Sequence, residues 1–178
     1  MSSYRYNTQR VSGVWFLYIG VVIIISAIFG GNSIFNPYIF GFGFAIGYFL
    51  IFGLPFINNK LAYGKNTKFQ DRMDNFTIII SLILVTLCGV LISFEDLRFL
   101  WLAVFIVMGL HFIGFYFSQG KIVLILGGLV TINGVLGLIL PLVPFLIFAI
   151  IDGILKISFG IYMISLRRNN FQRQENVS

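Results

Sequence analysis

The stretch AIIDGILKISFG, residues 149–160, places an aspartate and a lysine four positions apart inside a long apolar run. The run extends from residue 145 to residue 166, which is long enough for a helix to cross the hydrocarbon core of a bilayer. On a helix, Asp152 and Lys156 lie on one face, and acid before base is the favourable order. The sequence therefore predicts a membrane-spanning helix that hides two charges from lipid.

Small and polar residues form one stripe along this predicted helix, at the spacing i, i+3, i+4, i+7 and i+11. Its members are Ala149, Asp152, Gly153, Lys156 and Gly160. Small residues let helix backbones approach closely, and polar residues need partners that lipid does not offer. We expect the stripe to face other helices, with the two charges at about mid-depth. Each charge costs roughly 2.5–3.5 kcal/mol at that depth, so insertion depends on their pairing.

The composition of the whole chain also indicates that lipid surrounds it. Of its 178 residues, 58% are hydrophobic and 10% are charged, against roughly 25% charged in a soluble domain. We predict an all-α polytopic membrane helix bundle with six transmembrane helices. The predicted spans are 13–30, 34–57, 76–93, 99–117, 122–140 and 145–166. The links between most spans are short, which predicts antiparallel neighbours in one bundle covering residues 13–166.

Basic residues predict the orientation of the bundle. With the N-terminal segment 1–12 in the cytoplasm, the loop 58–75 and the tail 167–178 are also inside, and ten of the twelve Lys and Arg residues lie on that side. In the links expected on the opposite side of the membrane, Arg98 is the only basic residue. Both termini are therefore expected in the cytoplasm. The net charge of +6 fits an anionic membrane surface and not nucleic acid, and we expect membrane lipid as the partner.

Other polar residues lie at the depth of the charged pair. His111, the single histidine, is about one turn from the middle of its span, and Thr131 and Asn133 are near the middle of theirs. We hypothesise that these three residues converge with Asp152 and Lys156 in a substrate or proton site. The alternatives are a purely structural ion pair, an interior histidine with a hydrogen-bond partner, and interhelical hydrogen bonds from Thr131 and Asn133.

Further residues are assigned to packing. Gly43 and Gly47, spaced as in G-x-x-x-G, are expected to pack helices together, as are Gly153 and Gly160. The single cysteine, Cys88, excludes an internal disulfide. The sequence has no phosphate-binding loop, zinc-protease motif or serine-hydrolase motif, so we predict no catalytic residue, no metal and no cofactor. The polar loop containing KLAYGKNTKFQDRMDN either caps the bundle, docks a partner or is a solvated connector.

Four segments together carry a resemblance, namely GGN (30–32), KLAYGKNTKFQ (60–70), GLHFIGF (109–115) and DGILKISFG (152–160). They resemble a family of small uncharacterised bacterial six-span membrane proteins, which implies a bacterial plasma membrane location and no known activity. In size and span number the chain is also similar to the substrate-binding membrane subunits of energy-coupling-factor vitamin importers. SAIFGG (26–31) matches poorly the small residues that those subunits present to a partner.

Three interpretations of function remain. The first is small-solute transport or binding through the mid-membrane polar site. The second is a non-catalytic membrane component, such as a stress, immunity or assembly factor, in which the Asp152–Lys156 pair is structural. The third is an intramembrane enzyme, which is the least favoured. All three leave room for a membrane protein partner or a homo-oligomer.

Overall fold

The computed structural model describes residues 6–92 and 96–166, and this part of the chain is helical without a strand. The α-helices are α1 (Gln9–Ile28), α2 (Pro37–Tyr48), α3 (Pro55–Leu61), α4 (Lys68–Leu91), α5 (Leu97–His111), α6 (Tyr116–Gln119), α7 (Lys121–Ile139) and α8 (Phe145–Ser165). A 3-10 turn (Gly31–Ser33) precedes α2, and a π-helical turn (Phe49–Gly53) continues it. The prediction of an all-α fold is confirmed.

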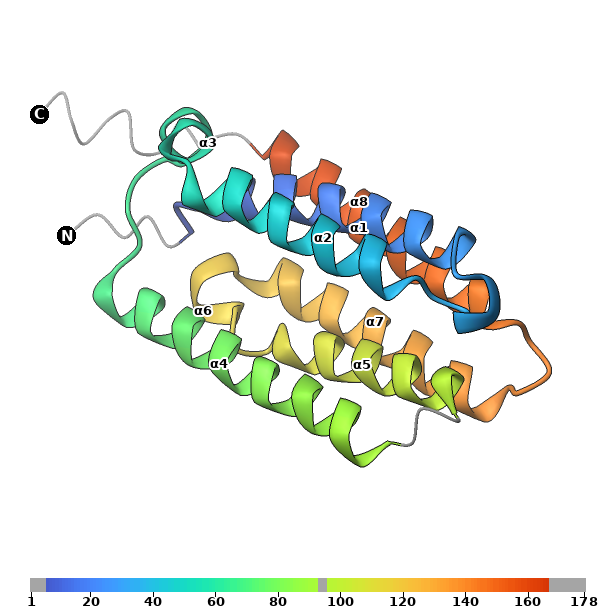
Figure 1. Cartoon of the computed structure of the whole chain (residues 1–178). Coiled ribbons are helices and arrows are strands. Elements are labelled where there is room, and N and C mark those ends of the chain that lie inside the picture. The colour runs from blue at the N-terminus through green and yellow to red at the C-terminus, as the bar shows by residue number, and fades with distance from the viewer. Residues whose placement is uncertain (1–5, 93–95, 167–178) are drawn as a thin grey trace, which may run out of the picture.

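The long helices lie side by side in two groups (Figure 1). Helix α1 packs against α2 and α8, helix α5 packs against α4 and α7, and the contact of α7 with α8 joins the groups. Helices α1, α4 and α7 begin, and α8 ends, at one end of the bundle. We call it the basic end, because the described basic residues other than Arg98 and Lys156 lie there: Arg10, Lys60, Lys65, Lys68, Arg72 and Lys121.

Glycine pairs let α1 and α8 approach so closely that their backbones touch. A Cβ atom added to Gly20 would lie 2.6 Å from the carbonyl oxygen of Gly153, and one added to Gly13 would lie 2.8 Å from that of Gly160. The glycines of each helix are seven residues apart, so both pairs lie on one seam of two antiparallel helices. Two of the glycines predicted to pack helices, Gly153 and Gly160, therefore lie in the most extensive helix contact of the bundle.

Helices α5 and α7 also approach closely at glycines spaced seven residues apart. Added Cβ atoms at Gly127 and Gly134 of α7, also seven apart, would lie 2.6 Å from the carbonyl oxygen of Gly109 and 2.7 Å from Ile106 Cγ1 of α5. The two helix groups thus each contain one glycine-packed antiparallel pair.

The third contact of this kind joins α2 to α1. A Cβ atom added to Gly43 would lie 2.7 Å from Val22 Cγ1, and one added to Gly47 would overlap the ring of Tyr18. The Tyr18 ring lies against Gly47 of α2, and its hydroxyl donates a hydrogen bond of 2.9 Å to the carbonyl oxygen of Gly43. Both glycines of the predicted G-x-x-x-G pattern therefore face α1.

Large side chains fill the space between the two groups in two apolar clusters. The cluster toward the far end surrounds Phe35, which has no exposed surface and whose ring centroid is 4.3 Å from that of Trp101. The cluster toward the basic end contains Phe16 of α1, Phe112 of α5 and Met163 of α8, and the two phenylalanine rings meet edge to face at 5.2 Å. Glycine therefore packs helices within a group, and aromatic residues pack the groups together.

Local signals set the helix ends, and some differ from the predicted spans. Thr67 and Gln70 form a capping box, so α4 begins at Lys68 and only residues 62–67 of the predicted loop 58–75 connect α3 to α4. Within the predicted span 34–57, Leu54 is extended because Pro55 follows it, so the helix breaks there. Within the predicted span 99–117, α5 ends at His111 and a turn leads to α6.

Arg98 joins α5 to the end of α7 at the far end of the bundle, which is the end opposite the basic end. Its guanidinium donates hydrogen bonds to the carbonyl oxygens of Val143 and Gly137, both at 2.7 Å, and of Leu140 at 3.1 Å. These carbonyls lie at the end of α7 and in the turn to α8, where no helical N–H is available to them. Arg98 of α5 thereby caps α7.

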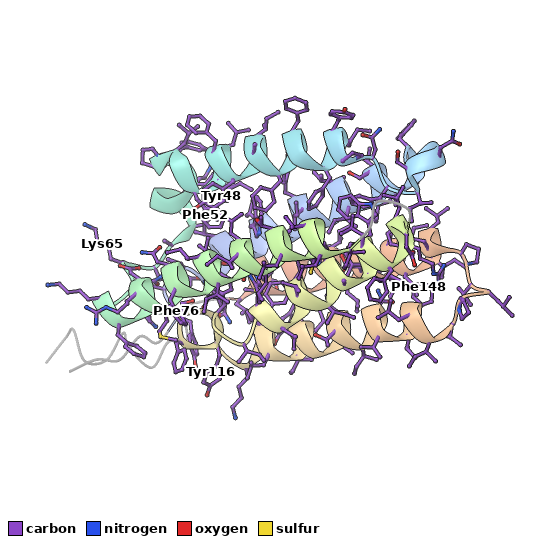
Figure 2. The ribbon with its side chains drawn as sticks, turned by 60° about the horizontal axis from the view of Figure 1, so that its bottom comes forward. Tyr48, Phe52, Lys65, Phe76, Tyr116 and Phe148 are labelled. Atoms are coloured by element: carbon purple, nitrogen blue, oxygen red, sulfur yellow. The ribbon has the colours of Figure 1, made fainter. Side chains whose placement is uncertain are left out.

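Four of the helices, α1, α4, α7 and α8, are long and apolar enough to cross a membrane, and the apolar helices 37–53 and 97–111 are shorter. Their outward surfaces carry exposed Ile, Leu and Phe side chains (Figure 2). This is the profile of a membrane protein. Helix α1 is central, because 56% of its apolar 18-residue stretch is buried. Helix α4 lies at the edge, because only 11% of the corresponding stretch is buried.

Replacing Gly20 by alanine is expected to destabilise the protein by about 1–3 kcal/mol, because the new methyl group forces α1 away from the α8 backbone. The matched control is Gly128→Ala, since nothing lies within 4 Å of a Cβ at Gly128. The control should be neutral or slightly stabilising. Unfolding in detergent measures both, and equal stability of the two variants would contradict the role given to the α1–α8 seam.

Candidate functional site

Asp152 and Lys156 form an ion pair on the face of α8 that is turned into the bundle. Lys156 Nζ lies 2.5 Å from both carboxylate oxygens of Asp152. The Asp152 side chain has no exposed surface and that of Lys156 is 6% exposed. The spacing of four residues in one helix brings the two groups together, and Gly153 between them keeps α1 close enough to exclude lipid.

The pair lies between the two apolar clusters. Phe148 and Ala149 of the far-end cluster precede it on α8, and Met163 of the basic-end cluster follows it. Charges so placed cannot reach headgroups or water without leaving the interior, so each depends on the other for its stability. The electrostatic attraction is strong in such surroundings, and so is the penalty for removing one partner.

Asn133 lies close to the pair. Its side-chain Nδ2, on α7, donates a hydrogen bond of 2.9 Å to the carbonyl oxygen of Phe148, which is one helical turn before Asp152. Asn133 is buried, so this bond satisfies a polar group inside the bundle and fixes α7 against α8. It does not contact either charge through a hydrogen bond.

His111 is bound to a different helix. Its Nδ1 lies 2.8 Å from the hydroxyl oxygen of Ser81 on α4, and no hydrogen bond joins it to α8. The ring packs edge to face on Phe112 and Phe115, with centroids 4.9 Å apart in each case. The contact that positions His111 is the one with α4.

Thr131 lies in the α5–α7 contact. A Cβ atom on Gly109 would overlap Thr131 Oγ1, so the threonine fills the space that the glycine leaves. The structure thus brings Asp152 and Lys156 together, sets Asn133 one turn away, and places His111 and Thr131 at the contacts of α5 with α4 and α7.

Comparison with known families adds one match. The chain belongs to DUF6609, a family of unknown function, whose model matches residues 1–173. The match agrees with the resemblance to an uncharacterised family. No curated protein and no solved structure matches the chain.

A polar network at the basic end of the DUF6609 protein is not evident from the sequence. The loop after α3 docks on the start of α1: the side-chain amide of Asn7 donates to the carbonyl oxygen of Lys65 at 2.8 Å, the Thr8 hydroxyl donates to Asn66 Oδ1 at 3.1 Å, and the N–H of Tyr63 donates to the carbonyl oxygen of Asn7 at 3.0 Å. Of the three interpretations of this loop, the structure supports a cap on the bundle.

Asp74 extends the network to α6. The Ser118 hydroxyl donates a hydrogen bond of 2.6 Å to Asp74 Oδ1, and the Asn66 side chain approaches Oδ2 at 3.5 Å. Gln119, next to Ser118, donates to Thr8, and its Oε1 is the one buried side-chain polar atom without a partner in the described residues. The network joins segments that are far apart in the chain, so no local spacing could have predicted it.

Metal ligands and the single cysteine are the remaining site types. Within the described residues, no group of three or more His, Cys, Asp or Glu side chains could hold a metal ion. Cys88 is a free, half-buried thiol on α4.

Replacing Asp74 by asparagine is expected to raise the melting temperature in detergent at pH 7.5. Asp74 lies ahead of the apolar run of α4 that begins at Phe76, and burial raises the pKa of its carboxyl from 3.8 to about 6, with a smaller opposing effect from the Ser118 hydrogen bond and a raising effect from the charge of Asp71. Because the folded state holds this proton to higher pH than the unfolded chain, stability falls as the pH rises through this interval.

The advantage of Asp74→Asn should therefore shrink when the pH is lowered from 7.5 to 5. Asp71→Asn, on the exposed side of the same helical turn, is the control and should change the melting temperature less. A difference between Asp74→Asn and the wild type that is constant with pH would contradict this explanation.

Proposed function

We propose that the chain is a bacterial plasma membrane protein that crosses the bilayer six times, with both termini in the cytoplasm, and that it binds or transports a small solute through the polar site around Asp152 and Lys156. The observation that carries the proposal is an ion pair buried in the middle of apolar helices. Ionisable groups at such a depth are costly, and in membrane proteins they commonly mark substrate or ion pathways.

The six-span arrangement is supported by the way the helices lie. The shorter helices α2 and α5 run alongside the four long ones, α2 is prolonged by its π-helical turn, and neighbours in the chain are antiparallel. Apart from Lys156 inside α8, the described basic residues lie at the basic end, except for Arg98 at the opposite end. This is the asymmetry expected of a bilayer with a cytoplasmic face at the basic end.

The chemistry of the pair limits the solute. A group that binds Asp152 must replace an ammonium group, and one that binds Lys156 must replace a carboxylate. Leaving either charge unpaired in the interior is costly, so a solute that opens the pair has to compensate both charges or deliver a proton to Asp152. A small polar solute with a cationic and an anionic group meets this condition. Asn133 offers a further hydrogen-bonding group on α7.

A second candidate is a non-catalytic membrane component in which the pair fixes helix packing. Two observations favour it: Asp152 and Lys156 satisfy each other through both carboxylate oxygens, and His111 is bound to Ser81 and not to the pair. In this case the pair sets the position of α8 against α1 and α7, and the function depends on a surface of the bundle.

Single and double substitutions separate the two candidates. Asp152→Asn and Lys156→Met are each expected to destabilise the purified protein by about 3–5 kcal/mol, because each leaves one charge buried and unpaired, whereas the double variant should unfold close to the wild type. If the pair is a solute site, the stable double variant reaches normal membrane levels but does not restore the phenotype of a deletion strain. Full restoration by the double variant would contradict a solute site and support the structural candidate.

A further inference from the structure

The first turns of α4, at the basic end, expose one face that carries a shallow hollow. Helix α4 contacts α5 and α6, and its other faces are exposed. The hollow is shallow and open to the surroundings, and its lining residues are Lys68, Asp71, Arg72, Asn75, Phe76 and Ile79. These positions recur every three or four residues, so the hollow follows one face of the helix through three turns.

The side chains that line the hollow change from charged to apolar along α4. Lys68 and Arg72 provide two cations one turn apart at its outer part, where Asp71 provides one carboxylate. Within the described residues neither cation forms an ion pair with a carboxylate, so the outer part is basic on balance. Phe76 and Ile79, which are 56% and 57% exposed, provide an apolar wall at its inner part. Figure 2 shows Phe76 on α4, farther from the end of the bundle than Lys65 of the preceding loop.

We infer that this hollow binds an anionic phospholipid, with the phosphate on Lys68 and Arg72 and the first part of an acyl chain on Phe76 and Ile79. A single helix face that passes from two cations, without a carboxylate partner in the described ranges 6–92 and 96–166, to exposed apolar side chains matches a molecule with an anionic head and an apolar tail. The change occurs between Asn75 and Phe76, where α4 passes from polar to apolar sequence and where the headgroup layer would lie.

The other basic residues of this end are arranged differently. Lys60 of α3 lies over the ring of Phe56, with Nζ 5.6 Å from the centroid, and Lys65 lies in the loop that docks on α1. They carry the same charge at the same end of the bundle but do not line the hollow. They therefore provide a matched control for charge alone. The inference depends on the membrane embedding of α4 and not on solute transport by the Asp152–Lys156 site.

The test is native mass spectrometry of the full chain, released from detergent after incubation with phosphatidylglycerol or phosphatidylcholine. The wild type is expected to retain phosphatidylglycerol preferentially. Lys68→Gln with Arg72→Gln should weaken this binding roughly 10- to 30-fold, as expected for the loss of two basic residues near a lipid surface. Lys60→Gln with Lys65→Gln should leave it within about twofold, and the charge-conserving Lys68→Arg should retain it. Phe76→Ser should weaken binding without changing the charge.

Three outcomes would overturn the inference. Equal retention of the two lipids would mean that the hollow does not select an anionic headgroup. An equal loss in the Lys60/Lys65 variant would mean that net charge, and not the hollow, attracts the lipid. Displacement of the lipid by millimolar inorganic phosphate, with no effect of Phe76→Ser, would mean that the cations bind phosphate alone. The substituted side chains are exposed, so the melting temperatures should match that of the wild type and will show whether each variant is folded.

Discussion

The backbone contact of α1 with α8 is the interaction on which the rest of the structure depends. Gly13 and Gly20 meet Gly160 and Gly153 without intervening side chains, so the polar stripe of α8 is closed against α1. In a lipid solvent no water satisfies a charge left at the helix surface. The close contact therefore determines that Asp152 and Lys156 pair with each other in the interior. It also makes α1 the centre of the bundle, to which α2 is added on the other side.

The polar groups of the interior form separate contacts and not one cluster. The ion pair lies within α8, Asn133 joins α7 to α8, and His111 joins α5 to α4. Each contact satisfies its own polar groups, as the low polarity of the interior demands. A solute site would have to be made by opening the ion pair, whereas a structural role requires no change. This difference is the physical basis of the two candidate functions.

The sequence predicted the features that depend on one helix at a time. The helical fold, the apolar segments and the inward stripe of α8 follow from hydropathy and from the spacing of Ala149 to Gly160. The spacing of Asp152 and Lys156 also predicted their contact. What could not be predicted is the rotation of each helix about its own axis. For this reason the pairing of Gly20 with Gly153 and the attachment of His111 to Ser81 were not foreseen.

Local signals account for other differences. The capping box of Thr67 and Gln70 was present in the sequence, but the charges that follow it indicated a loop. The break at Leu54 lies within an apolar run, where hydropathy gives no sign of it and only Pro55 does. The network around Asp74 joins the start of α1, the loop before α4 and α6 through single hydrogen bonds, which leave no pattern in the sequence.

We propose that lipid surrounds this bundle and that the short helices α2 and α5 cross the bilayer as well as the long ones. Cysteine labelling in a Cys88→Ser background tests it, with single cysteines at Asn32 after α1, Lys65 before α4 and Leu142 after α7, all of which are exposed. A membrane-impermeant maleimide should label positions 32 and 142 in intact cells, and position 65 only after permeabilisation. Labelling of positions 32 and 65 from the same side would mean that α2 does not cross the bilayer and would contradict the six-span account.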